Sequence, residues 1–229
     1  MDGKMLYEEC GVFGIYGHKD TATFITLGLH ALQHRGQEAA GIVTFDGEHF
    51  HSHRALGLVG DNFNDPNVIQ KLEGALGIGH VRYATTGETI IRNVQPLFAE
   101  FKFGGFSVAH NGNLTNARRL RKELIERGCI FQSTMDTETI VHLIARSEYG
   151  KVVDRLVDAL TQIQGAYSLV AMSQKKLIGV RDPTGVRPLV LGRKDDAYIL
   201  TSETCALDII GAKFVREVEN GEIVYVEND

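Results

Sequence analysis

The order of the predicted secondary structure elements constrains the fold of this chain more than any other feature. Glycines divide the sequence into many short segments, with 25 Gly against 4 Pro and no Trp. Short apolar segments typical of strands dominate the first half, helical patterns follow, and strand-like segments then return. Because strands and helices come in blocks, we expect an α+β fold with its helices segregated onto the faces of sheets.

The first half predicts a strand, a helix and a hairpin. Val12–Tyr16 reads as a buried strand, and Asp20 is placed to cap the helix that follows. Ile42–Phe45 and Phe50–Ala55 flank Asp46-Gly47, a dipeptide typical of tight hairpin turns. Further strands are expected at Ala75–Val81 and Phe106–His110.

The second half predicts helices and then a series of strands. The helices are expected at Asn116–Arg127, Thr137–Arg146 and Val152–Ile163. Gly128 is placed to end the first helix, and Asp136 to cap the second. The strands are expected at Tyr167–Met172, Leu177–Val180, Leu189–Leu191, Tyr198–Thr201, Phe214–Val218 and Ile223–Val226. Asn220-Gly221 predicts that the last two strands form a hairpin.

Composition and charge argue against several classes of protein. The 24 Lys and Arg residues and 29 Asp and Glu residues give a formal net charge of −5, whereas nucleic-acid-binding proteins usually have a concentrated basic face. Three cysteines form no disulfide framework, so we expect the protein to be located in the reducing cytoplasm. No apolar segment approaches the ~20 residues of a membrane-spanning helix. We expect neither a nucleic-acid nor a membrane partner.

Three polar loops are the strongest candidates for function. They are His34-Arg-Gly-Gln-Glu38, Gly79-His-Val-Arg-Tyr-Ala-Thr-Thr-Gly87 and His110-Asn-Gly-Asn113. Taken singly, each has a structural explanation, because glycine and asparagine suit turns and arginine suits a surface. Such loops also carry function disproportionately, and Cys10 stands at the start of the first strand. Together these segments predict one site.

Two other patterns are weaker. His49, His51 and His53 alternate along a predicted strand, so they are either metal ligands or the polar outer face of a hairpin. We favour the polar face, because no carboxylate or cysteine is placed to support a metal. Gly77-Ile-Gly79 lacks the third glycine and the following helix of a dinucleotide-binding loop.

Five motifs occur in an order that resembles one enzyme family. They are Cys10-Gly-Val-Phe-Gly-Ile15, His34-Arg-Gly-Gln-Glu-Ala-Ala-Gly41, Gly79-His-Val-Arg-Tyr-Ala-Thr-Thr-Gly87, His110-Asn-Gly-Asn-Leu-Thr-Asn116 and Asp136-Thr-Glu138. The series resembles the glutaminase domain of the glutamine phosphoribosylpyrophosphate amidotransferase family, whose members are class II (N-terminal nucleophile) glutamine amidotransferases. The resemblance covers the chain from Cys10 onward. It implies a four-layer αββα sandwich that hydrolyses L-glutamine to glutamate and ammonia.

The role that the resemblance implies for Cys10 explains the polar leader. In the family the nucleophilic cysteine is N-terminal, and its own α-amine, with a pKa of about 7.7–8.0, serves as the base. The leader Met1–Glu9 would convert that amine into an amide, and it lacks the apolar core of a secretory signal. We therefore expect residues 1–9 to be a propeptide, removed by autocatalytic cleavage, and residues 10–229 to be the glutaminase domain.

Two other motifs acquire roles at the reacting end of glutamine from the same resemblance. The Asn111 side chain and the Gly112 N–H are implied to form the oxyanion hole, since both are neutral donors that can face a developing negative charge. The backbone of Arg35 and Gly36 is implied to position the nucleophile and its amine. Each role assigns a loop residue to the reacting end of glutamine.

The amino-acid end of glutamine is the second recognition problem. Arg82 is implied to hold the α-carboxylate, because its planar fork matches a carboxylate, and Thr85 to add a hydroxyl contact there. Asp136 is implied to accept from the α-ammonium group, although a helix cap is an equally simple role for it. Cys129 and Cys205 are expected to be structural, as are Arg181–Leu189 and Ser202-Glu-Thr204.

The partners and cofactors also follow from the resemblance. Ammonia is expected to pass to phosphoribosyl pyrophosphate, which gives 5-phosphoribosylamine in the first step of de novo purine biosynthesis. No phosphoribosyltransferase motif is visible, so that domain and its Mg²⁺ are expected in a part of the polypeptide absent from this chain. No cofactor and no metal is expected for the domain itself. An iron–sulfur cluster occurs in some relatives, but its ligand pattern is not visible here, and a homo-oligomer is expected for the full enzyme.

Two alternatives remain open at this stage. A glutamine–fructose-6-phosphate transamidase domain tends to carry Tyr-Asp in place of Gln37-Glu38, and Trp and His in place of Tyr83 and Thr86. A non-catalytic amidotransferase-like binding domain is the other alternative, and the intact Cys10 argues against it.

Overall fold

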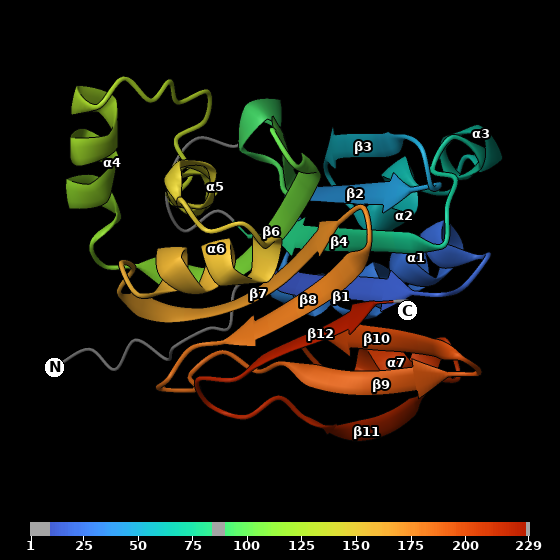
Figure 1. Cartoon of the computed structure of the whole chain (residues 1–229). Helices are drawn as coiled ribbons and strands as arrows, with labels where there is room; N and C mark the ends of the chain where they lie inside the picture. The colour runs from blue at the N-terminus through green and yellow to red at the C-terminus, as the bar shows by residue number, and fades with distance from the viewer. Residues whose placement is uncertain (1–9, 84–89, 228–229) are drawn as a thin grey trace, which may run out of the picture.

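Two antiparallel sheets pack face to face at the centre of the molecule (Figure 1). The computed structural model describes residues 10–83 and 90–227. The first sheet has the order β11 (Lys213–Glu217), β9 (Val190–Lys194), β10 (Ala197–Thr201), β1 (Gly11–Tyr16), β4 (Leu76–Arg82), β2 (Ala39–Phe45), β3 (Phe50–Leu56). The second has the order β12 (Ile223–Glu227), β8 (Lys176–Arg181), β7 (Gly165–Ser173), β6 (Gly104–Leu114), β5 (Leu97–Phe101).

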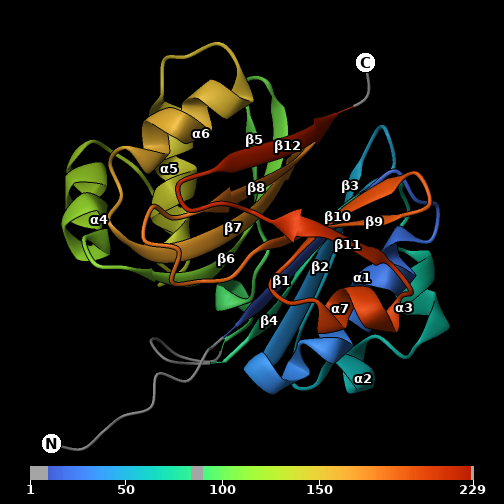
Figure 2. The ribbon, with the colours of Figure 1, turned by 90° about the horizontal axis from the view of Figure 1, so that it is seen from below.

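Helices cover the outer face of each sheet, as the view from below shows (Figure 2). The first sheet is covered by α1 (Thr21–Ala31), α2 (Val59–Asn62), α3 (Pro66–Gln70) and α7 (Cys205–Ile209), with the short 3₁₀ helix η1 (Gln33–Arg35) after α1. The second is covered by α4 (Ala117–Glu126), α5 (Thr137–Arg146) and α6 (Val152–Leu160), and the 3₁₀ helix η2 (Ile91–Asn93) precedes β5. The expected four-layer αββα sandwich and α+β class are confirmed.

The period of two along each strand produces these layers. In β1, Val12 packs between the sheets while Phe13 faces the α1 side, and both are fully buried. In β6, Ala109 likewise lies between the sheets, whereas Val108 faces α5. Three apolar clusters result, one between the sheets and one under each helical layer. Within residues 10–83 and 90–227, no helix is long and apolar enough to cross a membrane.

Local sequence signals placed most elements correctly. The hairpin of β2 and β3 turns at Asp46-Gly47 as expected, and Gly128 ends α4 with a φ of +84°. Asp20 precedes α1, but its side chain makes no capping hydrogen bond. β5, α2, α3 and α7 were not anticipated.

The hairpin expected at Asn220-Gly221 is wrong. The chain does turn there, with a Gly221 φ of +76°. However, β11 pairs with β9 in the first sheet, and β12 pairs with β8 in the second. The turn therefore carries the chain from one sheet to the other, because each sheet offers the incoming strand an unpaired edge.

Candidate active site

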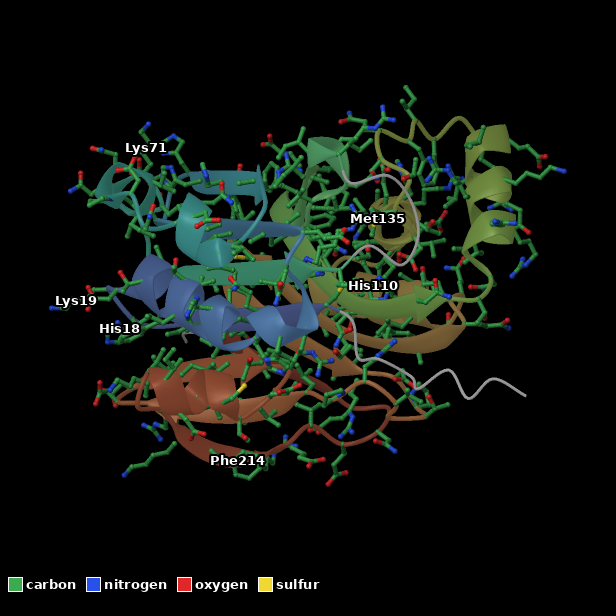
Figure 3. All side chains as sticks on the ribbon, turned by 180° about the vertical axis from the view of Figure 1, so that it is seen from behind. His18, Lys19, Lys71, His110, Met135 and Phe214 are labelled. Atoms are coloured by element: carbon green, nitrogen blue, oxygen red, sulfur yellow. The ribbon has the colours of Figure 1, made fainter. Side chains whose placement is uncertain are left out.

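The strand-end motifs meet at a narrow cleft of about 20 Å³ where the ends of β1 and β4 approach β6. The residues that line the cleft are Cys10, Arg82, Tyr83, Gln95, His110, Gly112, Asn113, Met135 and Asp136. Figure 3 shows His110 and Met135 close together, beside the strand β6 and the start of α5. Four of the predicted site residues therefore share one cleft: Cys10, Arg82, Gly112 and Asp136.

Cys10 is held by Arg35 through two hydrogen bonds. The Cys10 N–H donates to the Arg35 carbonyl oxygen over 2.8 Å, and the Arg35 Nε donates to the Cys10 carbonyl oxygen over 2.8 Å. Cys10 has a φ of +72°, a left-handed conformation that costs about 1–3 kcal/mol in a residue with a Cβ. The thiol faces the Tyr83 carbonyl oxygen at 3.8 Å. The predicted positioning role of Arg35 thus involves its side chain as well as its backbone.

Gly36 lets the loop after η1 lie directly against the end of β4. A Cβ at position 36 would approach the backbone carbonyl carbon of Arg82 to 2.6 Å, closer than real Cβ contacts. Arg82 is the last residue of β4, and its side chain is 1% exposed. Because position 36 is a glycine, Arg35, which holds Cys10, lies beside the end of β4 that carries Arg82.

Asn111 and Gly112 lie in the long strand β6 and differ in their surroundings. Gly112 has a φ of +145°, and a Cβ there would lie 2.2 Å from the Ala166 carbonyl oxygen, so only glycine fits. Asn111 is fully buried and shares the inter-sheet face of β6 with Ala109. Neither its amide nitrogen nor its amide oxygen has a hydrogen-bond partner within residues 10–83 and 90–227. A buried amide left in this state costs about 1–3 kcal/mol, and a ligand that accepts from it would recover part of that energy.

The Asp136 side chain reaches from the start of α5 to β6. Its Oδ2 accepts from the Leu114 N–H over 2.9 Å, and its Oδ1 lies 3.5 Å from the His110 Nδ1. No capping hydrogen bond from this side chain to α5 is present, so the helix-cap interpretation is wrong. Burial raises the pKa of Asp136, but His110 and two backbone N–H groups outweigh it, and the pKa lies below its usual value. The carboxylate is therefore ionised near neutral pH.

A buried polar network that the sequence did not reveal supports His110. The His110 carbonyl oxygen accepts from His80 Nε2 over 3.2 Å and from Gln95 Nε2 over 3.4 Å. The His110 N–H donates to Gln95 Oε1 over 2.8 Å, and its ring contacts Thr137 Oγ1 at 3.1 Å. Burial, with the nearby charge of Arg82, lowers the pKa of His80 to about 3. His80 is part of a motif that suggested a site, but Gln95 carries no signal in the sequence.

Thr85 lies outside the described residues. Several other predicted features lie apart from the cleft. Cys129 packs against the α4–α6 core, consistent with a structural role. His51 pairs with Asp46 over 2.7 Å and His53 packs edge-on against Phe63, and no group of three potential metal ligands occurs within residues 10–83 and 90–227.

A larger cavity, of about 320 Å³, lies between the end of β3, β5 and α5. Its lining includes the titratable side chains of Arg54, Arg92, Glu138 and His142, and it shares no residue with the cleft. It contains no thiol, so size alone would have misplaced the site.

Sequence comparison connects this geometry to one family. A family model described as a glutamine amidotransferase domain matches residues 80–208, more than half of the chain. The chain belongs to the glutamine amidotransferase domain family. The match includes Arg82, Asn111, Gly112 and Asp136, so most of the cleft lies in the shared domain.

Individual members of this family are similar over nearly the whole chain. The amidophosphoribosyltransferase of Rhizobium etli is 59% identical over 227 residues, which is 99% of this chain and 46% of that protein. A solved structure described as the allosteric regulatory enzyme of purine biosynthesis superposes with a TM-score of 0.92 at 45% identity, over 96% of this chain and 47% of that one. The glutamine phosphoribosylpyrophosphate amidotransferase from Bacillus subtilis, in complex with ADP and GMP, gives a TM-score of 0.90 at 44% identity over the same shares. The chain thus spans about half the length of these relatives.

Proposed function

We propose that this domain hydrolyses L-glutamine to glutamate and ammonia, with Cys10 as the nucleophile. One observation carries the proposal: a single cleft is lined by a thiol, Cys10, a buried arginine, Arg82, and an ionised aspartate, Asp136. These charges complement the α-carboxylate and α-ammonium groups of a free amino acid. A thiol in the same cleft suits attack on the side-chain amide of that amino acid.

The proposed reaction divides between two steps. The Cys10 sulfur attacks the amide carbon of glutamine and gives up its proton, while Asn111 and the Gly112 N–H stabilise the oxyanion. The carbon–nitrogen bond then breaks, and the nitrogen leaves as ammonia with that proton. Water hydrolyses the thioester, which releases glutamate and restores the thiol.

The proposal requires a free α-amine at Cys10, so it includes removal of residues 1–9. The left-handed φ of Cys10 supports this step, because the angle is defined by the bond to Glu9 and its strain ends when that bond is cut. The amine released there becomes the general base.

The activity of the whole protein is a wider proposal. We infer that the ammonia is transferred to phosphoribosyl pyrophosphate, which yields 5-phosphoribosylamine for purine biosynthesis. The support is the name amidophosphoribosyltransferase carried by relatives of about twice this length. A phosphoribosyltransferase domain with Mg²⁺, a homo-oligomer and a cytoplasmic location belong to the same proposal. An iron–sulfur cluster in the full protein stays a prediction.

The decisive experiment combines intact mass with a covalent probe. The active protein should have lost residues 1–9, and a diazoketone analogue of glutamine should label Cys10 stoichiometrically. Asn111→Ala should label more slowly and reduce kcat for glutamine hydrolysis by about 100–1,000-fold. Full glutaminase activity with all nine leader residues attached would refute the proposed base, and activity of Cys10→Ala would refute the proposed nucleophile.

A further inference from the structure

Glu203 occupies a position next to the nucleophile loop that no motif role explains. It follows β10 and does not line the cleft, and its side chain is 30% exposed. Its Oε1 is in close contact with the Arg35 Nη1, and its Oε2 lies 3.1 Å from the His34 Nε2. The Cys205 thiol lies 3.6 Å from the same Oε2.

The contact with Arg35 leads directly to Cys10. The Arg35 guanidinium is almost fully buried, and its Nε donates to the Cys10 carbonyl oxygen. One guanidinium therefore bridges the Glu203 carboxylate and the backbone of the nucleophile. A buried guanidinium without a nearby carboxylate would be strongly disfavoured, so the ion pair helps to fix its orientation.

The residues just before Glu203 hold the strand that follows Cys10. The Val12 N–H donates to the Ser202 Oγ over 3.0 Å, and the Ser202 N–H donates to the Val12 carbonyl oxygen over 3.1 Å. The Thr201 hydroxyl donates to the same carbonyl oxygen over 3.2 Å. Thr201 and Ser202 are thus hydrogen-bonded to β1 two residues beyond Cys10, and Glu203 is connected to Cys10 through Arg35.

We propose that Glu203 is a positioning residue, which orients Arg35 so that the guanidinium holds the strained Cys10 backbone with its thiol in the cleft. This inference rests on the proposed role of Cys10 as the nucleophile. Burial raises the pKa of the Glu203 carboxyl, but Arg35 and His34 outweigh it and hold the pKa below its usual value, so the pairing partner is a carboxylate. Glu203 does not line the cleft, so in the proposed arrangement it does not contact glutamine.

The expected effect of losing this carboxylate is on kcat rather than on KM. A displacement of about 1 Å at a reacting atom can reduce a rate about 100-fold. We therefore expect Glu203→Gln to reduce kcat for glutamine hydrolysis by about 10–100-fold. KM should stay within about two-fold, since the Arg82 and Asp136 contacts remain.

The chain offers a matched control in Glu217→Gln. Glu217 also pairs with an arginine, Arg181, over 3.2 Å. The Arg181 guanidinium lies outside the cleft and donates to the carbonyl oxygens of Gly185, Arg187 and Val218. Loss of this second pair should leave kcat and KM unchanged. A general effect of removing a carboxylate would appear in both variants.

A double-mutant cycle with Arg35 distinguishes positioning from a purely structural role. If Glu203 acts through Arg35, then Glu203→Gln in an Arg35→Met background should change kcat by less than about two-fold. If Glu203 only stabilises its own turn, its substitution should reduce kcat equally in both backgrounds. Chemical denaturation of every variant reports the folded fraction.

Each outcome decides the matter. A lower kcat with unchanged KM, lost in the Arg35→Met background, supports the proposal, and a wild-type kcat in folded Glu203→Gln overturns it. If Glu203→Gln fails to fold, Glu203→Asp replaces it, because aspartate keeps the negative charge on a shorter side chain. This variant should reduce kcat several-fold at unchanged KM. A wild-type kcat in Glu203→Asp would overturn the proposal equally. If processed wild-type protein neither hydrolyses glutamine nor labels at Cys10, the proposed function fails first, which is a separate result.

Discussion

Replacement of His80 by glutamine tests the buried network behind the cleft. His80 is fully buried, and its pKa is lowered from 6.5 to about 3, first by burial and also by the charge of Arg82. As the pH falls below about 6.5, the unfolded chain binds a proton at this residue and the folded chain does not. The free energy of unfolding therefore decreases by about 1.4 kcal/mol per pH unit from this group alone, until the pH nears 3.

Between pH 6.5 and pH 4.5, the contribution of His80 amounts to roughly 2–3 kcal/mol. In His80→Gln this contribution disappears, while the amide Nε2 can still donate to the His110 carbonyl oxygen as the ring does. As the pH is lowered from 6.5 to 4.5, the unfolding free energy of the variant should therefore rise relative to that of the wild type by roughly 2–3 kcal/mol. Because both proteins share every other titrating group, the difference isolates position 80.

Denaturant titrations at half-unit pH steps measure this difference. His30→Gln is the matched control, because His30 is exposed on α1 and meets solvent in both states. The unfolding free energy of this control should change with pH in the same way as that of the wild type over the same range. Parallel curves for His80→Gln as well would show that His80 is protonated in the folded protein, and the description of the buried network would be wrong.

Two further substitutions test the cleft itself. Arg82→Lys keeps the charge but loses the planar fork, so KM for glutamine should increase at least ten-fold with a smaller change in kcat; an unchanged KM in steady-state kinetics would contradict contact with the α-carboxylate. Gly112→Ala forces a Cβ to within 2.2 Å of the Ala166 carbonyl oxygen at a φ of +145°, so it should destabilise the fold by several kcal/mol in chemical denaturation. The matched substitution Gly60→Ala, where a Cβ meets nothing within 4 Å, should leave stability nearly unchanged.

The fold was predictable where local signals decide it. Helix α5 has the predicted limits, Thr137–Arg146, because its apolar residues recur at helical spacing. The pairing of β11 and β12 was not predictable in the same way. Asn220-Gly221 specifies a turn, but which strand edge receives the next segment depends on partners far away in the sequence.

The sequence predicted which loops form the candidate site, but not the contacts between distant residues that hold these loops in place. Gly36 and Gly112 stand out in the motifs, and the structure shows that close backbone contacts require both. Gln95 gave no such signal, because a single glutamine has no periodicity or turn preference that marks it as a partner of His110. Glu203 gives no signal in the sequence either, because its ion-pair partner Arg35 lies 168 positions away.

The left-handed conformation of Cys10 explains why the supporting residues matter as much as the cleft. A cysteine at a φ of +72° persists only where neighbouring contacts outweigh its strain, and both the N–H and the carbonyl oxygen of Cys10 are hydrogen-bonded to Arg35. The Arg35 guanidinium is buried, so it depends in turn on a carboxylate such as Glu203 to offset its charge. If cleavage at Glu9 removes the strain, the same contacts become free to hold the new N-terminus without opposing it. In the proposed mechanism, Arg35 and Glu203 therefore hold Cys10 both before and after residues 1–9 are removed.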